Sequence, residues 1–525
     1  MKFSGRLIAF LLLGLAYAVA TFLVLRHTMD EVRSDRVTIR MSQWQLEGGV
    51  REAIDAIIRR YEQLNPRVHV VQIAVPDPVY QPWIQTQMIG DTGPDLAEYS
   101  WGWPDIARNF QPITAEVMQP NPYNRGTPLA GRPWRDTFID GMTSSDNYVQ
   151  ALSDYFGVSL TTHVMRIVFN RPLLRDITGR DTPPRTYREL LALCDKVHAY
   201  DRAHRLDLVP LANSRTTHIN LTGEVMASLT PRLSAQMDFQ HRLKLDPADL
   251  GVAYLRGEWS YDSPDLTAAF DVLREFGAMC TPGFMQRERD SALTDFVAGR
   301  ALMMVTPSWE ASSLLQLCPF ALGAFRFPYP REDDPVYGRF TTSPMSEGQL
   351  FTGMPFYVNR HTRHRAEAID FLRFMSSQEG AAIFTRVSNW QPVTLGVKAS
   401  DFADQFKLQP DGYCWYAGFL GPSGHPDASK FIQSELGQLW NNGGSVDAFR
   451  RVLRAGVADK VRDDFRRDII AGVSNARRED VAAVAAAELA PANARAEPVR
   501  LMTVGNEIYI YQTRAALALP VRSTP

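Results

Sequence analysis

The residues of this sequence best suited to chemistry are tryptophans that stand beside glycines, prolines and the ends of strand-like runs, where loops usually carry function. These tryptophans are Trp44, Trp101, Trp309, Trp390 and Trp415. Two of them have a carboxylate close by in the chain, Glu47 after the first and Glu310 directly after Trp309. Together these aromatic and acidic residues are the candidate ligand-binding residues.

Flat aromatic rings next to carboxylates and amides are typical of carbohydrate binding. A sugar ring has an apolar C–H face that stacks on an aromatic side chain, and its hydroxyl edge forms hydrogen bonds with carboxylates and amides. The alternative is that each tryptophan is a core or hinge residue. Trp309 is the strongest candidate, because it follows the strand-like run 301–305 through Thr306-Pro307-Ser308, a short non-helical link that can leave its ring at the edge of a lobe.

The sequence lacks the common catalytic and nucleotide-binding motifs. We find no GxGxxG, GxxxxGK[ST], GxSxG or HExxH pattern, and the 10 histidines show no spacing typical of metal ligands. Carboxylate pairs such as Asp333-Asp334 and Asp463-Asp464 are typical of solvated surfaces. We therefore expect no catalytic residues, no metal and no cofactor.

Composition narrows the class of protein further. The chain has 525 residues, which exceeds one ordinary core, and a formal net charge of -2. Nucleic-acid binding needs clustered Lys and Arg that neutralise several phosphates, so nucleic acid is not expected as a partner. The cysteines, Cys194, Cys280, Cys318 and Cys414, form no CxxC pair, and any disulfide connectivity stays open.

The N-terminus carries a long apolar run, residues 7–25, with Lys2 and Arg6 before it and Arg26 after it. A membrane-spanning helix needs roughly 17 to 25 apolar residues, whereas the apolar part of a cleaved signal peptide is about 7 to 15 residues long. The length favours an uncleaved anchor. A cleaved signal stays open as the alternative, because Ala16-Tyr17-Ala18 and Ala18-Val19-Ala20 resemble cleavage sites.

Strand and helix patterns alternate along the body of the chain. Residues 37–44 form a strand-like run, an amphipathic helix is predicted from Val50 to Leu64, and residues 68–75 form a second strand. Thr186 and Glu189 form a capping box at the start of another helix, and Ser263-Pro264 is a further helix start. This alternation predicts an α/β fold.

Several segments, in this order, resemble family 1 extracellular solute-binding proteins of ABC importers, the group that includes maltose- and other sugar-binding proteins. The match covers roughly residues 37–477. The segments are the first strand with Trp44, Tyr61-Glu-Gln-Leu-Asn-Pro66, Gly93-Pro-Asp-Leu96, Arg166-Ile-Val-Phe-Asn170, Pro183-Pro-Arg-Thr-Tyr-Arg-Glu-Leu190, Phe296-Val-Ala-Gly-Arg-Ala-Leu-Met-Met-Val-Thr-Pro-Ser-Trp-Glu310, the helix 366–375 with Ser376-Ser-Gln-Glu379, and Trp390-Gln-Pro392.

This resemblance implies a two-lobed periplasmic-binding-protein fold of type II with discontinuous lobes, preceded by the N-terminal apolar helix. We expect a signal or anchor segment and stalk at 1–36, lobe 1 at 37–169 and 357–395, lobe 2 at 170–356 and 396–490, and a C-terminal extension with a hairpin at 491–525. The family's stretch carries a sugar-stacking tryptophan where Trp309 stands. The resemblance further implies that Trp44, Glu47 and Trp101 approach Trp309 and Glu310 from the other lobe.

The function implied is the substrate-binding component of an ABC importer, which binds a carbohydrate between its lobes by hinge closure. Its expected partners are a small carbohydrate, the permease subunits and, through residues 7–25, the extracytoplasmic face of the cell membrane. Two rivals stay open. One is an anchored sensor or scaffold with the same fold, motivated by the anchor and the C-terminal extension, and the other is a carbohydrate-active enzyme.

Overall fold

A computed structural model describes residues 36–100, 103–150, 152–238, 241, 245–342, 344–347, 351–412, 418–441, 443–489 and 515, with side chains inside the last long helix described up to Ile470. The chain divides into two compact units. Unit 1 consists of Met1–Val164, Ser308–Gln316 and Leu350–Lys407, and unit 2 of Met165–Pro307, Leu317–Gln349 and Leu408–Pro525.

Unit 1 is built on a mixed sheet with the strand order β2-β1-β3-β13-β6. Strands β1 (Val37–Gln43), β2 (Val68–Ala74) and β3 (Leu96–Glu98) are parallel, and β13 (Phe356–Val358) runs antiparallel to β3 and to β6 (Gly157–Val158). The sheet therefore joins a segment from late in the chain to strands from its beginning. A separate pair is formed by β7 (Thr161–His163) and β12 (Phe351–Gly353).

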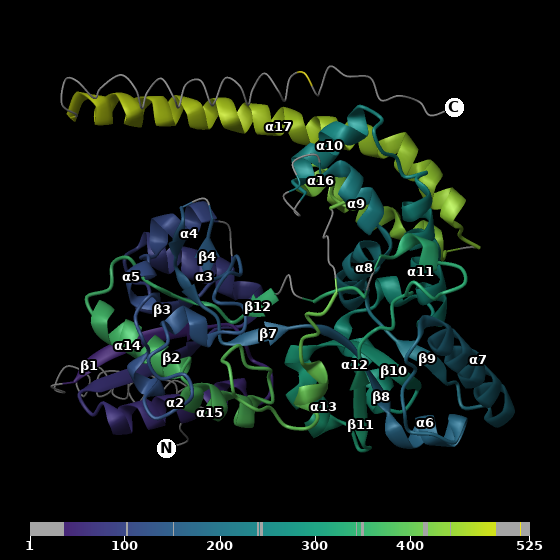
Figure 1. Cartoon of the computed structure of the whole chain (residues 1–525), viewed down its shortest axis with the longest axis horizontal. Coiled ribbons are helices and arrows are strands. Elements are labelled where there is room, and N and C mark those ends of the chain that lie inside the picture. The colour runs from purple at the N-terminus through teal and green to yellow at the C-terminus, as the bar shows by residue number, and fades with distance from the viewer. Residues whose placement is uncertain are drawn as a thin grey trace, which may run out of the picture. The chain divides into compact units, whose positions relative to one another are not determined.

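The helices of unit 1 bury apolar faces against this sheet and against one another. They include α2 (Val50–Leu64), α3 (Asp77–Ile89), α14 (Arg365–Met375) and α15 (Gln378–Ser388). Helix α2 has the predicted bounds, and its apolar face is buried from Val50 to Tyr61, whereas Leu64 at its end is exposed. Figure 1 shows α15 lying beside α2, and the two helices are in contact.

Shorter elements complete unit 1. They are α4 (Trp103–Asn109), α5 (Thr114–Val117), the 3-10 turns η1 (Pro122–Asn124), η2 (Trp134–Thr137), η4 (Ser308–Glu310) and η6 (Ala403–Phe406), the hairpin β4 (Tyr148–Val149) with β5 (Asp154–Tyr155), and α13 (Ala311–Leu317). Helix α13 follows directly on η4. Its last residue, Leu317, is where the chain returns to unit 2.

Unit 2 is built on a sheet with the strand order β11-β8-β10-β9. Strand β10 (Ala301–Pro307) runs antiparallel to β8 (Met165–Asn170) and parallel to β9 (Val209–Ala212), and β11 (Leu322–Phe325) is antiparallel to β8. Every residue of β8 and β10 is buried. Residues 301–305, which the sequence predicted as a strand-like run, lie in β10.

The helices of unit 2 pack against its sheet and against one another. They are α6 (Arg171–Thr178), α7 (Tyr187–His204), α8 (Arg215–Leu229), α9 (Pro231–Met237), α10 (Pro247–Leu255), α11 (Pro264–Met279), α12 (Arg289–Val297) and α16 (Pro426–Glu435), with the 3-10 turns η3 (Phe284–Gln286), η5 (Gly338–Phe340) and η7 (Leu436–Leu439). The predicted helix start at Thr186 is confirmed, because its side chain accepts a hydrogen bond from the backbone N–H of Glu189 at 3.2 Å.

The last helix, α17 (Val446–Leu489), has 44 residues. At about 1.5 Å per residue it is about 66 Å long, and Figure 1 shows it continuing past α10 and α16 of the same unit. The first part of α17 has a buried apolar stripe from Val446 to Phe465 that packs into the unit 2 core. Further along the helix, Ile470 is 69% exposed. In the sequence, charged residues hide the helical period of the turns that precede the Ala-rich stretch from residue 481.

The units and the expected lobes share the discontinuous order but differ at their boundaries. The chain enters unit 2 at Met165 rather than at residue 170, and residues 308–316, 350–356 and 396–407 belong to unit 1 rather than to the segments assigned to lobe 2. The predicted N-terminal apolar helix and the C-terminal hairpin lie outside the described residues. Among the helices that the structure describes, none is both long enough and apolar enough to cross a membrane.

Candidate functional site

The carboxyl ends of the parallel strands in unit 1 bring together a tryptophan and a buried carboxyl group. Strand β1 ends at Gln43 and is followed by Trp44, and Glu98 is the last residue of β3, so both lie at the same edge of the sheet. Ligands of open α/β sheets bind at this edge. Glu98 is fully buried, and its carboxyl oxygens accept hydrogen bonds from Trp44 N–H (3.1 Å) and Gln45 Nε2 (2.6 Å).

The ring of Trp44 is held by a neighbouring tyrosine. The ring centroids of Trp44 and Tyr80 are 5.0 Å apart at an interplanar angle of 57°. The hydroxyl of Tyr80 in turn donates to the backbone oxygen of Glu98 at 2.9 Å and lies 2.8 Å from Ser42 Oγ. Trp44 is only partly buried, so part of this residue stays accessible while Tyr80 supports its ring.

The environment of Glu98 favours its neutral form. Burial raises the pKa of Glu98 to about 8, the hydrogen bonds from Gln45 and Trp44 oppose the rise, and the carboxylates of Glu47 and Asp77 add to it. A carboxyl group with this pKa is mostly protonated at neutral pH. A neutral carboxylic acid therefore stands beside the candidate ligand residues Trp44 and Glu47.

The loop that carries Trp44 and Glu47 ends at the start of α2. The carbonyl of Glu47 accepts the N–H of Val50 at 3.1 Å. Gly49 has φ +86°, and a Cβ there would lie 2.7 Å from the carbonyl oxygen of Val387 at the end of α15. A Cβ at Gly48 would lie 3.1 Å from Oε1 of Gln316 in α13. Gly49 thus lets this loop lie against the end of α15, and Gly48 lets it lie against α13, the helix that follows the Trp309 segment.

Trp309 lies in η4, directly after the chain crosses from β10 into unit 1. Ser308 donates its N–H to the carbonyl of Val164 at 2.9 Å and its hydroxyl to the carbonyl of Thr162 at 3.2 Å, and its Oγ lies 3.2 Å from the N–H of Val164. These bonds fasten the segment to the end of β7. Trp309 and Glu310 therefore belong to the same unit as Trp44 and Glu47, whereas the sequence placed them in the opposite lobe.

Trp309 packs edge-on against His163, a residue that the sequence analysis did not single out. The ring centroids are 4.9 Å apart at 86°, and the ring of Trp390 lies 6.3 Å from His163 on another side. A Cβ at Gly353, on the neighbouring strand β12, would lie 1.6 Å from Nε2 of His163, so only glycine leaves room for this imidazole. Burial lowers the pKa of His163 to about 4, which keeps the ring neutral at neutral pH.

The candidate residues differ in exposure. Trp44, Glu47 and Trp309 are partly buried, whereas Trp390 is 2% exposed and Glu310 5% exposed. Trp390 belongs to the apolar core of unit 1, and Trp309 packs against the outside of that core. Trp101 and Trp415 lie outside the described residues. The structure thus gathers Trp309 and Trp390 around His163 and sets the Trp44–Glu47 loop beside the Trp309 segment, and the ligand-binding roles of these residues remain predictions.

Unit 2 carries a second buried carboxylate, Glu347, close in the chain to a crossing between the units. Arg166 donates Nη1 and Nη2 to it at 2.5 and 3.0 Å, Arg326 pairs with it at 3.2 Å, and the N–H of Gln409 donates to it at 2.7 Å. The chain enters unit 2 just before Arg166 and again just before Gln409, and it leaves the unit just after Glu347. One carboxylate therefore ties together segments that belong to three separate crossings.

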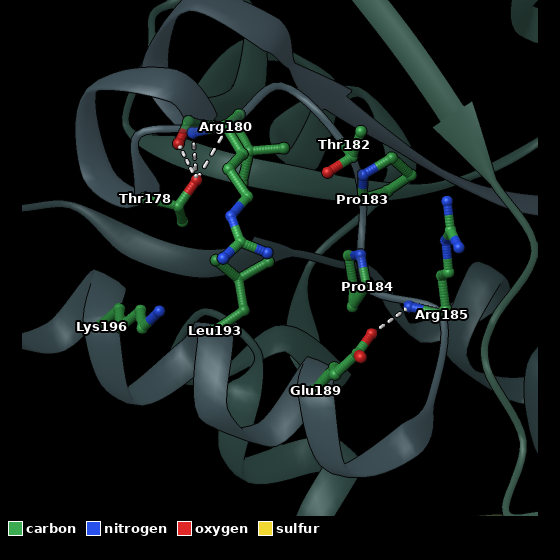
Figure 2. A pocket seen from close by; sticks show the side chains of 10 residues that line it. Thr178, Arg180, Thr182, Pro183, Pro184, Arg185, Glu189, Leu193 and Lys196 are labelled. Atoms are coloured by element: carbon green, nitrogen blue, oxygen red, sulfur yellow. Dashed lines mark hydrogen bonds between the residues drawn. The ribbon is translucent and has the colours of Figure 1, made fainter.

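A cavity of about 430 Å³ lies in unit 2 between α7 and the loop that follows α6. Figure 2 shows its lining of threonines, prolines and charged side chains, among them Arg180, Arg185, Lys196 and Glu189. Glu189 Oε2 accepts the backbone N–H of Arg185 at 2.7 Å, which closes the loop onto the helix. None of the sequence-predicted ligand residues lines this cavity. Within the described part of the chain, no cluster of three or more His, Cys, Asp or Glu side chains is arranged to hold a metal ion.

Comparisons with known proteins agree on one class. The sequence model of the family described as bacterial extracellular solute-binding protein matches residues 56–410. The multiple sugar-binding protein of Streptococcus mutans serotype c is 20% identical over 377 residues, which are 70% of this chain and 78% of that protein.

Solved structures share the fold at low sequence identity. RafE in complex with raffinose is 15% identical with a TM-score of 0.55 over 81% of this chain and 100% of that one. The apo form of RafE from Streptococcus pneumoniae gives the same TM-score, 0.55, over 82% of this chain and 99% of that one. Maltose-bound MalE3 of T. maritima is 17% identical with a TM-score of 0.52 over 80% of this chain and 98% of that one.

Proposed function

Because this chain belongs to the bacterial extracellular solute-binding proteins, we propose that it binds a carbohydrate outside the cytoplasm as the receptor of an ABC importer. The observation that carries the choice of ligand is the partly exposed ring of Trp309, held edge-on by His163 beside the loop of Trp44 and Glu47. Partly exposed aromatic rings on rigid supports, with acidic and amide groups at their edges, suit the C–H face and the hydroxyls of a sugar. The names of the relatives, a multiple sugar-binding protein, a raffinose complex and a maltose complex, support the same ligand class.

The proposal includes the hinge closure that the family resemblance implies. A ligand favours a closed form only through its higher affinity for that form. Small-angle scattering of the protein with and without saturating sugar should show a smaller radius of gyration in the bound state. An unchanged radius would remove closure from the mechanism while leaving sugar binding intact.

We also propose that residues 7–25 anchor the protein at the membrane, where permease subunits receive the sugar. The motive is the length of this apolar run, which is uninterrupted by charge. N-terminal sequencing of the protein from the membrane fraction tests the anchor. A mature chain that starts at Val19 or Thr21 would show a cleaved signal peptide instead.

The ligand class is tested by a thermal-shift screen of the full-length protein in detergent. Raffinose, maltose and chitin oligosaccharides are the first probes, because relatives of the same fold are named for these sugars or were solved with them. A ligand that binds only the folded state stabilises it by about 2.7 kcal/mol at about 100 times its Kd. The carbohydrate assignment would be rejected if no sugar or polyol in a broad panel raised the melting temperature while a solute of another class did.

A further inference from the structure

We propose that Glu98 is a positioning residue that, as a neutral carboxylic acid, holds the Trp44–Glu47 loop in its ligand-binding arrangement, so that ligand affinity falls when Glu98 loses its proton. This inference rests on the proposed function. Glu98 does not need to touch the sugar. It acts through the loop that carries two of the candidate ligand residues.

The geometry makes Glu98 the anchor of this loop. Both of its carboxyl oxygens are used, one by the backbone N–H of Trp44 and one by the side-chain amide of Gln45, the next residue. Its own backbone oxygen accepts the hydroxyl of Tyr80, whose ring supports Trp44. Glu98, a single residue of β3, therefore holds the backbone of Trp44 and the side chain of Gln45 directly. It holds the ring of Trp44 through Tyr80.

Full burial without an opposite charge favours a proton on Glu98. The residue is 0% exposed, and among the described residues no cationic side chain forms an ion pair with it. The groups that donate to its carboxyl oxygens, Trp44 N–H and Gln45 Nε2, are both neutral. They offset part of the cost of a buried charge but supply no opposite charge.

The charged groups around Glu98 oppose its ionisation. Glu47 from the loop and Asp77 from the start of α3 are both acidic, and Tyr80 and Tyr99 contribute only neutral hydroxyls near neutral pH. A second negative charge at this buried point would repel Glu47 and would be driven towards water. Because Glu98 is tied to Trp44 and Gln45, its movement would displace the loop, and the supported face of Trp44 would be lost.

The test is calorimetric titration with raffinose, or with maltose if raffinose gives no thermal shift, between pH 6 and pH 9.5. We expect the affinity of the wild-type protein to be flat up to about pH 7, about twofold lower at pH 8 and about tenfold lower at pH 9. Glu98→Gln keeps an acceptor for Trp44 and a polar partner for Gln45 and cannot ionise. Its affinity at pH 7 should stay within about threefold of wild type, and its pH profile should be flat.

Two further variants separate positioning from general damage. Glu98→Ala removes both tethers and should lower affinity at every pH without restoring a pH dependence. Glu62→Gln is the matched control, because Glu62 is also a partly enclosed carboxylate of unit 1 that accepts a backbone N–H, that of Val70, but its pKa is lowered. This control should keep the affinity and the pH profile of the wild type.

The outcomes decide between the proposals. A flat wild-type profile to pH 9.5, or the same alkaline loss of affinity in Glu98→Gln, would overturn the role of Glu98. If no sugar binds at any pH, the proposed function fails instead. The protonation of Glu98 is then tested by urea unfolding. The free energy of unfolding of wild type, relative to that of Glu98→Gln, should fall between about pH 4.5 and pH 8 and stay constant above pH 8.

Discussion

Glu98 in unit 1 and Glu347 in unit 2 are both buried: Glu98 is 0% exposed, and the side chain of Glu347 is 7% exposed. The two units provide them with different kinds of partner. Glu98 has a backbone N–H and a side-chain amide as partners, and the charges that act on it, those of Glu47 and Asp77, are other carboxylates. Glu347 lies between the guanidinium groups of Arg166 and Arg326. A carboxyl group that has no cation as a partner lowers its cost of burial by keeping its proton, whereas a paired group is held by its ion pairs.

The surroundings of each glutamate suit its place in the fold. Glu98 organises a loop beside the candidate sugar-binding residues, where a full negative charge would repel Glu47. Glu347 joins segments of chain that enter unit 2 from separate crossings, where strong and directional bonds are needed. Under the role proposed for Glu98, one buried carboxyl group supports ligand recognition in unit 1, while the other joins segments of chain in unit 2.

The largest effect should come from breaking the charge pair of unit 2. The side chain of Arg166 is 0% exposed, and Arg166→Ala leaves Glu347 with one guanidinium less in a buried place. We expect a loss of about 3–5 kcal/mol in the free energy of unfolding, measured by urea denaturation. The control is Arg175→Ala, which breaks the exposed pair with Asp181 (side chains 66% and 44% exposed) and should change it by less than about 1 kcal/mol. Equal effects of the two variants would refute the structural role of Glu347.

The next effect concerns ligand binding in unit 1. As a stacking platform, Trp309→Ala should weaken sugar binding by about 1–3 kcal/mol, or roughly tenfold to a hundredfold, with little loss of stability. Trp390→Ala is the contrasting variant, because Trp390 is 2% exposed in the core, and its removal should cost about 3–5 kcal/mol of stability. Titration calorimetry and thermal melting of both variants decide. Normal affinity with a collapsed melting temperature in Trp309→Ala would make it a core residue.

The third prediction, which separates the two glutamates most directly, is a pH dependence. The folded-state pKa of Glu98, about 8, lies above its ordinary value of 4.5, so its contribution to stability is complete below about pH 4.5 and is lost as the pH rises through 8. The pKa of Glu62 is lowered instead, so its contribution is present above the ordinary value and is lost as the pH falls through the lowered one. Urea unfolding of Glu98→Gln and Glu62→Gln against wild type should therefore give differences that change with pH in opposite directions. Parallel curves would contradict this assignment.

Much of the fold follows from local sequence patterns. The apolar residues from Val50 to Tyr61 recur at the helical period, and the helix has the predicted bounds. The side chain of Thr186 caps α7 by accepting the backbone N–H of Glu189, which is only three residues later in the chain. The family inferred from the order of such segments is confirmed by the match over residues 56–410. These predictions succeed because their causes lie within one turn or one strand.

The candidate site was predicted less completely, because its contacts join distant parts of the chain. Trp309 was singled out from its position after a strand, but its unit is decided by Ser308, whose bonds to Val164 and Thr162 span 144 and 146 residues. His163 was missed because a lone histidine in a strand has no local pattern. Glu98 was missed for the same reason, since its partners Trp44 and Gln45 lie 54 and 53 residues earlier.

By itself the sequence determined the α/β class, the family, the helices with a regular apolar period and the tryptophans worth testing, because periodicity, capping and order along the chain are local properties. Only the tertiary structure decided which side chains are neighbours: the Trp309 segment beside the Trp44–Glu47 loop, His163 over Gly353, and Glu347 between Arg166 and Arg326. It also decided protonation, since the pKa of Glu98 depends on burial and on the carboxylates of Glu47 and Asp77. Burial and electrostatic interaction depend on distances in space, and the sequence does not contain those distances until the chain has folded.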